Sequence, residues 1–309
     1  MPSTFVWEIH REAMDAHMSD ESGLALLDAD GDVPVKRRRR GGMLRLHHAQ
    51  EGTTLVDVGL QVWRGAMLLS DLLVACPSMV DGAVVLEMGA GCGLCGLLAA
   101  RLGAHAFITD IGENVLRNAS SNVALNRLES RAHVRKFDWT ELWRPDDWPK
   151  RRCSSDFGWD LDDRRTLQSA KRIVILAADV VYDDRATDAF VERLVDVVQW
   201  MQSQPLLESI LALIAVERRI NFCLDSLSTR SPAFDHFQKR LDELKASGDP
   251  VAFEFAAVSP TSIPQSFEYE RCSELEMLRV AVPCSPSHSA SHDSPRCPHA
   301  APSASTPSR

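Results

Sequence analysis

One stretch constrains the fold of this chain more than any other: residues 84–96, with the sequence VVLEMGAGCGLCG. Its first three residues are apolar and predict a short buried strand, and Glu87 follows them directly. Gly89, Gly91 and Gly93 then form a turn that runs into an apolar helical segment. Glycines let a ligand approach the backbone, and a helix start offers free N–H groups, so the stretch predicts a ligand site between a strand and a helix.

The same alternation of strand and helix continues along the chain. We expect strands at 84–86, 104–109, 132–137, 173–178 and 210–216, and helices at 63–75, 94–102, 113–126, 186–201 and 221–245. Two further strands, at 251–258 and 276–282, follow one another without a helix. We therefore predict an α/β fold with a doubly wound, seven-stranded sheet that is mostly parallel and carries an antiparallel edge hairpin.

Several segments lie outside this alternation. Residues 1–50 are expected to be a partly disordered extension, and residues 51–282 one domain, in which 140–171 is a loop insertion with a short helix. Residues 283–309 are rich in Ser and Pro and are expected to be disordered. The basic run at 36–40 is compatible with a nuclear localisation signal, a nucleic-acid-binding arm or a solvated loop.

Charge and composition narrow the possible partners. The formal net charge of −9 argues against nucleic acid as a direct partner. The chain has no secretory pattern at its start and no apolar stretch of about 18 residues, so no membrane association is expected. Its eight cysteines are expected to be reduced, and none of their spacings fits a metal site. Cys92 and Cys95 have the spacing of a redox pair, but small residues are needed in that turn anyway.

Acidic residues stand at the ends of five predicted strands, namely Glu87, Asp110, Asp138, Asp179 and Glu217. Ligands of such sheets bind beyond the carboxyl ends of the strands. A single acid at such a place is often a helix N-cap, but capping alone hardly explains five in a row. The acids therefore predict a shared site at this edge of the sheet.

Two cofactor classes compete for the site. The segment from Gly91 to Gly96 matches the dinucleotide pattern G-x-G-x-x-G, and Asp110 follows Gly93 by seventeen positions, so a nicotinamide oxidoreductase is one reading. However, Glu87 would repel a pyrophosphate, whereas it suits the cationic head of S-adenosylmethionine. Asp110 would then accept the ribose hydroxyls, and Asp138 or Trp139 would contact the adenine.

The motifs extend this second reading. Six motifs follow one another along the chain: GLQVWRGA around Trp63, LEMGAGCGLCG, ITD ending at Asp110, NVALN, FDW ending at Trp139 and ADVVY ending at Tyr182. Together they resemble the seven-stranded, Rossmann-like class I methyltransferases and, more narrowly, the lysine methyltransferases of family 16. The resemblance covers about residues 55–282, and the D-x-x-Y pair of Asp179 and Tyr182 is its signature.

This resemblance implies roles for named residues. The cofactor site would be lined by Trp63, Gly89, Ala90, Gly91, Asp110, Trp139 and Ala178, and the residue-level argument adds Glu87, Gly93 and Asp138. Asp179 and Tyr182 would be catalytic and line the channel of a substrate lysine. For either tryptophan the alternative is core packing, and for Tyr182 it is a buried aromatic at a strand end.

The expected function is that of an S-adenosylmethionine-dependent protein-lysine N-methyltransferase. The resemblance implies a protein substrate with an accessible lysine, nuclear and nucleic-acid-binding, and a location in the nucleus, the cytoplasm or both. We expect a monomer without a metal. A methyltransferase for a small molecule or a nucleic acid stays open, although ADVVY lacks the prolines of an N-P-P-Y-type strand end. A cofactor-binding scaffold without catalysis also stays open.

Overall fold

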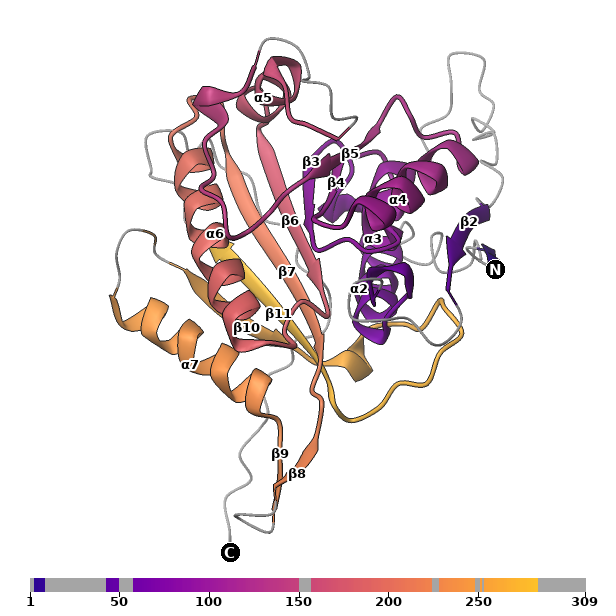
Figure 1. Ribbon diagram of the computed structural model, residues 1–309, viewed down its shortest axis with the longest axis vertical. Helices are drawn as coiled ribbons and strands as arrows, with labels where there is room; N and C mark the ends of the chain where they lie inside the picture. Colours follow the sequence, from indigo (N-terminus) through magenta and orange to yellow (C-terminus); the bar gives the residue numbers. More distant parts are fainter. Residues whose placement is uncertain are drawn as a thin grey trace, which may run out of the picture.

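A seven-stranded sheet forms the centre of the molecule (Figure 1). The computed structural model describes residues 3–8, 43–49, 58–149, 157–223, 228–247, 251 and 253–282. The strands are β3 (Val84–Met88), β4 (His105–Asp110), β5 (Ala132–Lys136), β6 (Arg172–Ala178), β7 (Ser209–Glu217), β10 (Glu254–Val258) and β11 (Leu275–Val282). Their order is β10-β11-β7-β6-β3-β4-β5. Strands β3 to β7 pair in parallel, and β11 and β10 are antiparallel at one edge, so the predicted fold class is confirmed.

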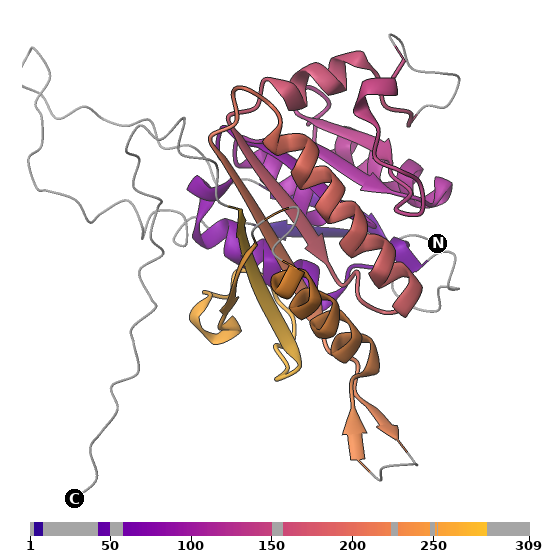
Figure 2. The ribbon, with the colours of Figure 1, turned by 90° about the vertical axis from the view of Figure 1, so that its left-hand side faces the viewer.

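Helices cover both faces of the sheet (Figures 1 and 2). One face carries α2 (Arg64–Ala75), α3 (Leu94–Arg101) and α4 (Glu113–Leu125), and the other carries α5 (Leu161–Gln168), α6 (Asp184–Gln202) and α7 (Pro232–Ser247). Each face has its own apolar core, because alternate strand residues point to opposite sides. On β3, for example, Val85 packs into the first core, whereas Leu86 and Met88 pack into the second.

Part of the predicted N-terminal extension is ordered. Strands β1 (Ser3–Glu8) and β2 (Met43–His48) form an antiparallel ribbon. Leu44 and Leu46 of β2 are fully buried in the core on the α4 side of the sheet. The side chains of Asn122 and Asn126 on α4 hydrogen-bond to backbone groups of β2 and so satisfy an otherwise open strand edge. The basic run at 36–40 lies outside the described residues.

The structure also corrects the expected helix at 221–245. Its first part forms two short strands, β8 (Asn221–Cys223) and β9 (Ser228–Arg230), and the helix begins only at Pro232. Proline fits the first helical position because its fixed φ suits a helix start and its missing N–H is not needed there. The β8–β9 ribbon continues from the carboxyl end of β7 and projects away from the sheet (Figure 2).

The insertion at 140–171 contains the short helix that the sequence predicts. Helix α5 begins with a capping box of Asp160 and Asp163. Asp163 also forms a buried, bidentate ion pair with Arg135 of β5, at 2.6 and 2.7 Å, which fastens the helix to the sheet. Residues 150–156 of the insertion and the tail at 283–309 lie outside the described residues. Among the helices that the structure describes, none is long and apolar enough to cross a membrane.

Candidate active site

The glycine turn connects β3 to α3 in the way the sequence predicts. Gly89, Gly91 and Gly93 all have positive φ angles, which glycine adopts without strain. A Cβ on Gly91 would lie 2.8 Å from the carbonyl oxygen of Gly59, so a larger residue would not fit there. The turn is therefore shaped by backbone contacts, and it leaves its outer side to the space beyond the strand ends.

A cavity of about 290 Å³ lies beside this turn, at the carboxyl ends of the parallel strands. Eleven of the twelve expected site residues line it: Trp63, Glu87, Gly89, Ala90, Gly91, Asp110, Asp138, Trp139, Ala178, Asp179 and Tyr182. Gly93 is the exception, because it forms the N-cap of α3, where a Cβ would lie 3.1 Å from Ile108 and 3.8 Å from Ala119. The structure thus brings four of the five predicted strand-end acids to one cavity, whereas Glu217 does not line it and instead forms an ion pair with Arg64.

Glu87 is buried under the turn. Its carboxyl group accepts a hydrogen bond of 2.9 Å from the backbone N–H of Gly96, in the first turn of α3. Burial raises the pKa of Glu87 to about 8. This side chain therefore organises the turn, as expected, but it is predominantly protonated at neutral pH and contributes little negative charge to the cavity. Its contact with a ligand's cationic head stays a prediction.

Asp110 stands at the end of β4 with its carboxylate held by the main chain. It accepts hydrogen bonds from the N–H groups of Gly91, at 2.9 Å, and Ile111, at 2.8 Å. Burial raises its pKa above the ordinary value, and these hydrogen bonds oppose the rise. Each carboxylate oxygen keeps further lone pairs, so the group is fixed in place and can still accept hydrogen bonds from a ligand.

Trp139 and Asp138 form the wall that follows β5. Trp139 packs against Phe190 of α6, with 5.3 Å between ring centres, and its indole N–H is buried without a hydrogen-bond partner among the described residues. Asp138 accepts hydrogen bonds from the backbone and the hydroxyl of Thr140. Core packing of Trp139 and lining of the cavity are therefore both observed, and the part of Trp139 available to a ligand is its ring, because the indole N–H is buried.

Asp179 holds three elements together. Its carboxylate oxygens accept hydrogen bonds from the backbone N–H of Gly65 in the first turn of α2, at 2.6 Å, and from that of Glu217 at the end of β7, at 2.7 Å. Asp179 has a φ of +54°, an uncommon conformation for a residue other than glycine. Burial raises its pKa to about 6. The side chain thus links the start of α2 and the end of β7 to the residue that follows β6.

Gly65 is a site residue that the sequence argument missed. A Cβ at this position would lie 2.6 Å from an Asp179 carboxylate oxygen, so the close approach of helix and acid requires glycine. The signal was present in the sequence as the glycine two positions after Trp63. Its meaning depends on a contact across 114 residues, which no local pattern reveals.

Tyr182 lies at the mouth of the cavity and is 46% exposed, so it is not a buried strand-end aromatic. Burial of part of the ring raises the pKa of its hydroxyl. The guanidinium of Arg219 lies near it, 6.0 Å from the centre of its ring and 4.9 Å from that of Trp63. Arg219 also lines the cavity, and the sequence argument did not single it out.

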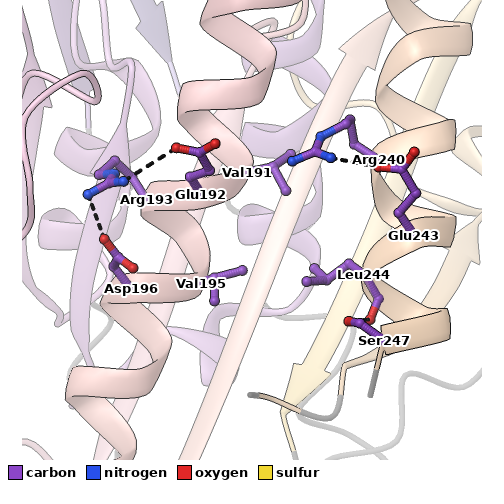
Figure 3. Close-up of a pocket in the computed structure, with 9 residues that line it drawn as sticks. All are labelled: Val191, Glu192, Arg193, Val195, Asp196, Arg240, Glu243, Leu244 and Ser247. Atoms are coloured by element: carbon purple, nitrogen blue, oxygen red, sulfur yellow. Dashed lines mark hydrogen bonds and ion pairs between the residues drawn. The ribbon is translucent and has the colours of Figure 1, made fainter. Parts of the chain in front are cut away.

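A second hollow lies on another part of the surface, between α6 and α7 (Figure 3). This α6–α7 groove is lined by Val191, Glu192, Arg193, Val195, Asp196, Arg240, Glu243, Leu244 and Ser247. Its charged side chains pair with one another: Arg193 with Glu192 and Asp196, and Arg240 with Glu243. None of the predicted site residues lines it. Within the described part of the chain, no three side chains gather as metal ligands.

The strand order and the cavity at the strand ends define the class of the chain, which is that of Rossmann-like α/β proteins with a ligand site at the carboxyl edge of the sheet. Comparison with known proteins narrows this class. Residues 43–157 match the model of a family described as lysine methyltransferase.

Relatives that match most of this chain agree with the family match. The chain is 33% identical over 244 residues to methyltransferase-like protein 22 of Mus musculus, covering 78% of this chain and 59% of that protein. It is 31% identical to methyltransferase-like protein 22 of Homo sapiens, covering 77% and 57%. It is 25% identical to the protein-lysine N-methyltransferase EEF2KMT of Homo sapiens, covering 78% and 65%. The resemblance to the lysine methyltransferases is therefore confirmed, although the chain spans only about three-fifths of the length of these relatives.

Proposed function

We propose that this protein is an S-adenosylmethionine-dependent protein-lysine N-methyltransferase. One observation carries the proposal: the glycine turn with Asp110 and the Asp179–Tyr182 pair face the same cavity. A methyl donor and an acceptor amine must meet in one place, because the transfer is an in-line displacement that depends on positioning. The family match and the named relatives support the lysine as acceptor.

The residues around the cavity fit the proposed cofactor. Asp110 is fixed by two backbone hydrogen bonds and keeps lone pairs for the two ribose hydroxyls. Trp139 offers an apolar ring beside Asp138, where an adenine would lie. The glycine turn, together with Ala90 and Ala178, keeps the remaining wall free of bulk. S-Adenosylmethionine supplies an electrophilic methyl group on a sulfonium when it is bound.

The other residues act on the acceptor. A lysine side chain, with an ordinary pKa of about 10.4, must lose its proton before its nitrogen can attack. In the proposed reaction Asp179 orients the amine and Tyr182 packs against its aliphatic chain at the mouth, and partial desolvation of the nitrogen lowers the pKa of the amine. The proton leaves to solvent through the half-exposed side of Tyr182. No nucleophile of the enzyme is needed.

The substrate is proposed to be a nuclear, nucleic-acid-binding protein with an accessible lysine, and the protein to act as a monomer in the nucleus, the cytoplasm or both. The resemblance to methyltransferase-like protein 22 and the basic run at 36–40 support this finer proposal. The negative net charge agrees with a protein rather than a nucleic acid as the direct partner. A cofactor-binding scaffold would keep Asp110 functional but would not need Asp179 and Tyr182 at one cavity.

The test uses S-adenosylmethionine labelled in its methyl group, the purified full chain and nuclear extract, with mass spectrometry of each labelled band. We expect labelled lysine in at least one protein. Asp179→Asn and Tyr182→Ala should abolish the label while calorimetry still detects cofactor binding. Label on an amino acid other than lysine, or on nucleic acid, would contradict the proposed acceptor. Cofactor binding without any label would favour the scaffold.

A further inference from the structure

Arg219 lines the cavity but has no role in the proposed reaction. It follows the carboxyl end of β7 by two residues, and its guanidinium lies over the ring of Trp63 and near that of Tyr182. Four carboxyl groups line the same cavity, on Glu87, Asp110, Asp138 and Asp179, whereas Arg219 is the one basic side chain among the described residues that line it. A cavity lined by the carboxylates of Asp110, Asp138 and Asp179 thus carries a single cation at its mouth.

The guanidinium of Arg219 contacts the rings of Trp63 and Tyr182, and its charge opposes the rise in the pKa of Asp179. The neighbouring arginines are paired, Arg64 with Glu217 at 2.6 Å and Arg218 with Glu276 at 3.2 Å. Arg219 is exposed and forms no ion pair with any described residue. Stacking on an aromatic ring occupies the face of a guanidinium and leaves the N–H groups along its edge free for a carboxylate. Its position over Trp63 therefore presents a ready-made carboxylate site to solvent.

We propose that Arg219 selects the protein substrate by binding an acidic side chain that flanks the acceptor lysine. This inference rests on the proposed function. The arrangement of charge favours it: the lysine enters toward the acidic residues of the cavity, and an acidic neighbour remains at the mouth on Arg219. A basic residue beside the lysine would be repelled by the guanidinium. Arg219 would therefore both attract acidic substrates and disfavour basic ones. The carboxylate of the cofactor is the competing partner, and exposure of Arg219 at the rim, beside Tyr182, favours the substrate.

A peptide library tests this directly. Each peptide has one central lysine and carries Glu, Ser or Lys at one flanking position, and labelling is measured with methyl-labelled S-adenosylmethionine. For the wild type we expect at least one position at which Glu gives about tenfold more labelling than Ser, which is the scale of one charge-assisted hydrogen-bonded pair. Arg219→Glu should reverse the preference at that position toward Lys. Arg219→Lys should keep the preference for Glu at a smaller ratio, because an ammonium lacks the bidentate edge.

Arg185→Glu is the matched control. Arg185 is exposed in the first turn of α6, near the same edge of the sheet, and does not line the cavity. The Arg185→Glu variant changes the net charge by the same amount as Arg219→Glu. Its preference for the residue that flanks the lysine should therefore equal that of the wild type. An equal shift in both variants would mean a general field effect and would overturn the assignment to Arg219.

Other results would also overturn the inference. The wild type would do so by labelling the library without regard to charge, or by labelling no peptide although it labels lysine in nuclear extract. The inference would also be overturned if Arg219→Glu lost affinity for the cofactor and kept the wild-type preference for the residue flanking the lysine. Arg219 would then bind the carboxylate of the cofactor. A wild-type protein that binds no S-adenosylmethionine would instead refute the proposed function itself, so the two failures are distinguishable.

Discussion

The cavity at the strand ends and the α6–α7 groove hold their charges in opposite ways. In the groove, guanidinium groups pair with carboxylates, as Arg193 does with Asp196 at 2.5 Å (Figure 3). In the cavity, Asp110 and Asp179 are bound by backbone N–H groups, and neither forms an ion pair with a described residue. Side-chain pairs neutralise each other, whereas an acid held by N–H groups is fixed in direction and still accepts a ligand. Two hollows that both contain carboxyl groups therefore have different capacities for chemistry.

The largest expected effect is a difference in kcat/KM between variants that each remove one acid, Asp179 from the cavity and Asp196 from the groove. Asp179→Ala should lower kcat/KM by at least about 100-fold, because the end of β6, the start of α2 and the end of β7 lose their shared acceptor and the acceptor amine is misplaced. It should also destabilise the fold by about 1–3 kcal/mol, since buried N–H groups are left unsatisfied. Asp196→Ala, which removes an acid of the groove, should leave kcat/KM within about twofold of the wild type. Equal losses in both variants would remove the distinction.

The second effect concerns the cofactor. Asp110→Ala should weaken the binding of S-adenosylhomocysteine by about 10- to 100-fold, because two charge-assisted hydrogen bonds to ribose hydroxyls are lost. Isothermal titration calorimetry measures it, with Asp196→Ala as the control of unchanged affinity. An Asp110→Ala protein with wild-type affinity would show that this carboxylate serves only the backbone of Gly91 and Ile111.

A third, smaller effect is the pH dependence of stability. Burial raises the pKa of Glu87 to about 8 and that of Asp179 to about 6, each above its ordinary value. The folded state therefore binds more protons than the unfolded state, so the contribution of each group is full below its unfolded pKa and is lost as pH rises through the folded pKa. Each pKa unit corresponds to about 1.4 kcal/mol.

Glu87→Gln tests this because it keeps a hydrogen-bond acceptor for Gly96 but cannot ionise. Chemical denaturation at pH 5, 6, 7 and 8 should show a wild-type free energy of unfolding that falls with pH, and a shallower fall in the variant. The exposed residue Glu129, changed to Gln, provides the control. Parallel pH curves for wild type and Glu87→Gln would contradict the buried, protonated state of Glu87.

The smallest effect is expected in the groove. Arg240→Ala removes a partly exposed guanidinium that contacts Asp188 and Glu243, so it should lower the free energy of unfolding by at most about 1 kcal/mol. The kcat/KM should be unchanged. A loss of activity without a loss of stability would assign the α6–α7 groove a role in the reaction and end the contrast with the cavity.

The two hollows also show what the sequence can and cannot predict. The alternation of strands and helices predicts the sheet, and parallel strands bring their ends together, so Asp110 and Asp179 are found from local patterns. The contact of Asp179 with Gly65, the position of Arg219 over Trp63 and the packing of β2 on α4 depend on residues far apart in the chain. The prediction of a helix at 221–245 is wrong in its first part, where a β-ribbon precedes the helix that begins at Pro232.

The central claim is that the cavity at the strand ends is a methyl-donor site. A calorimetric titration of the wild-type chain with S-adenosylmethionine, run beside the same titration with NAD, tests it most directly. The account predicts saturable binding of S-adenosylmethionine at one site per chain with a Kd in the micromolar range, and no heat of binding with NAD. Binding of NAD without binding of S-adenosylmethionine would contradict it.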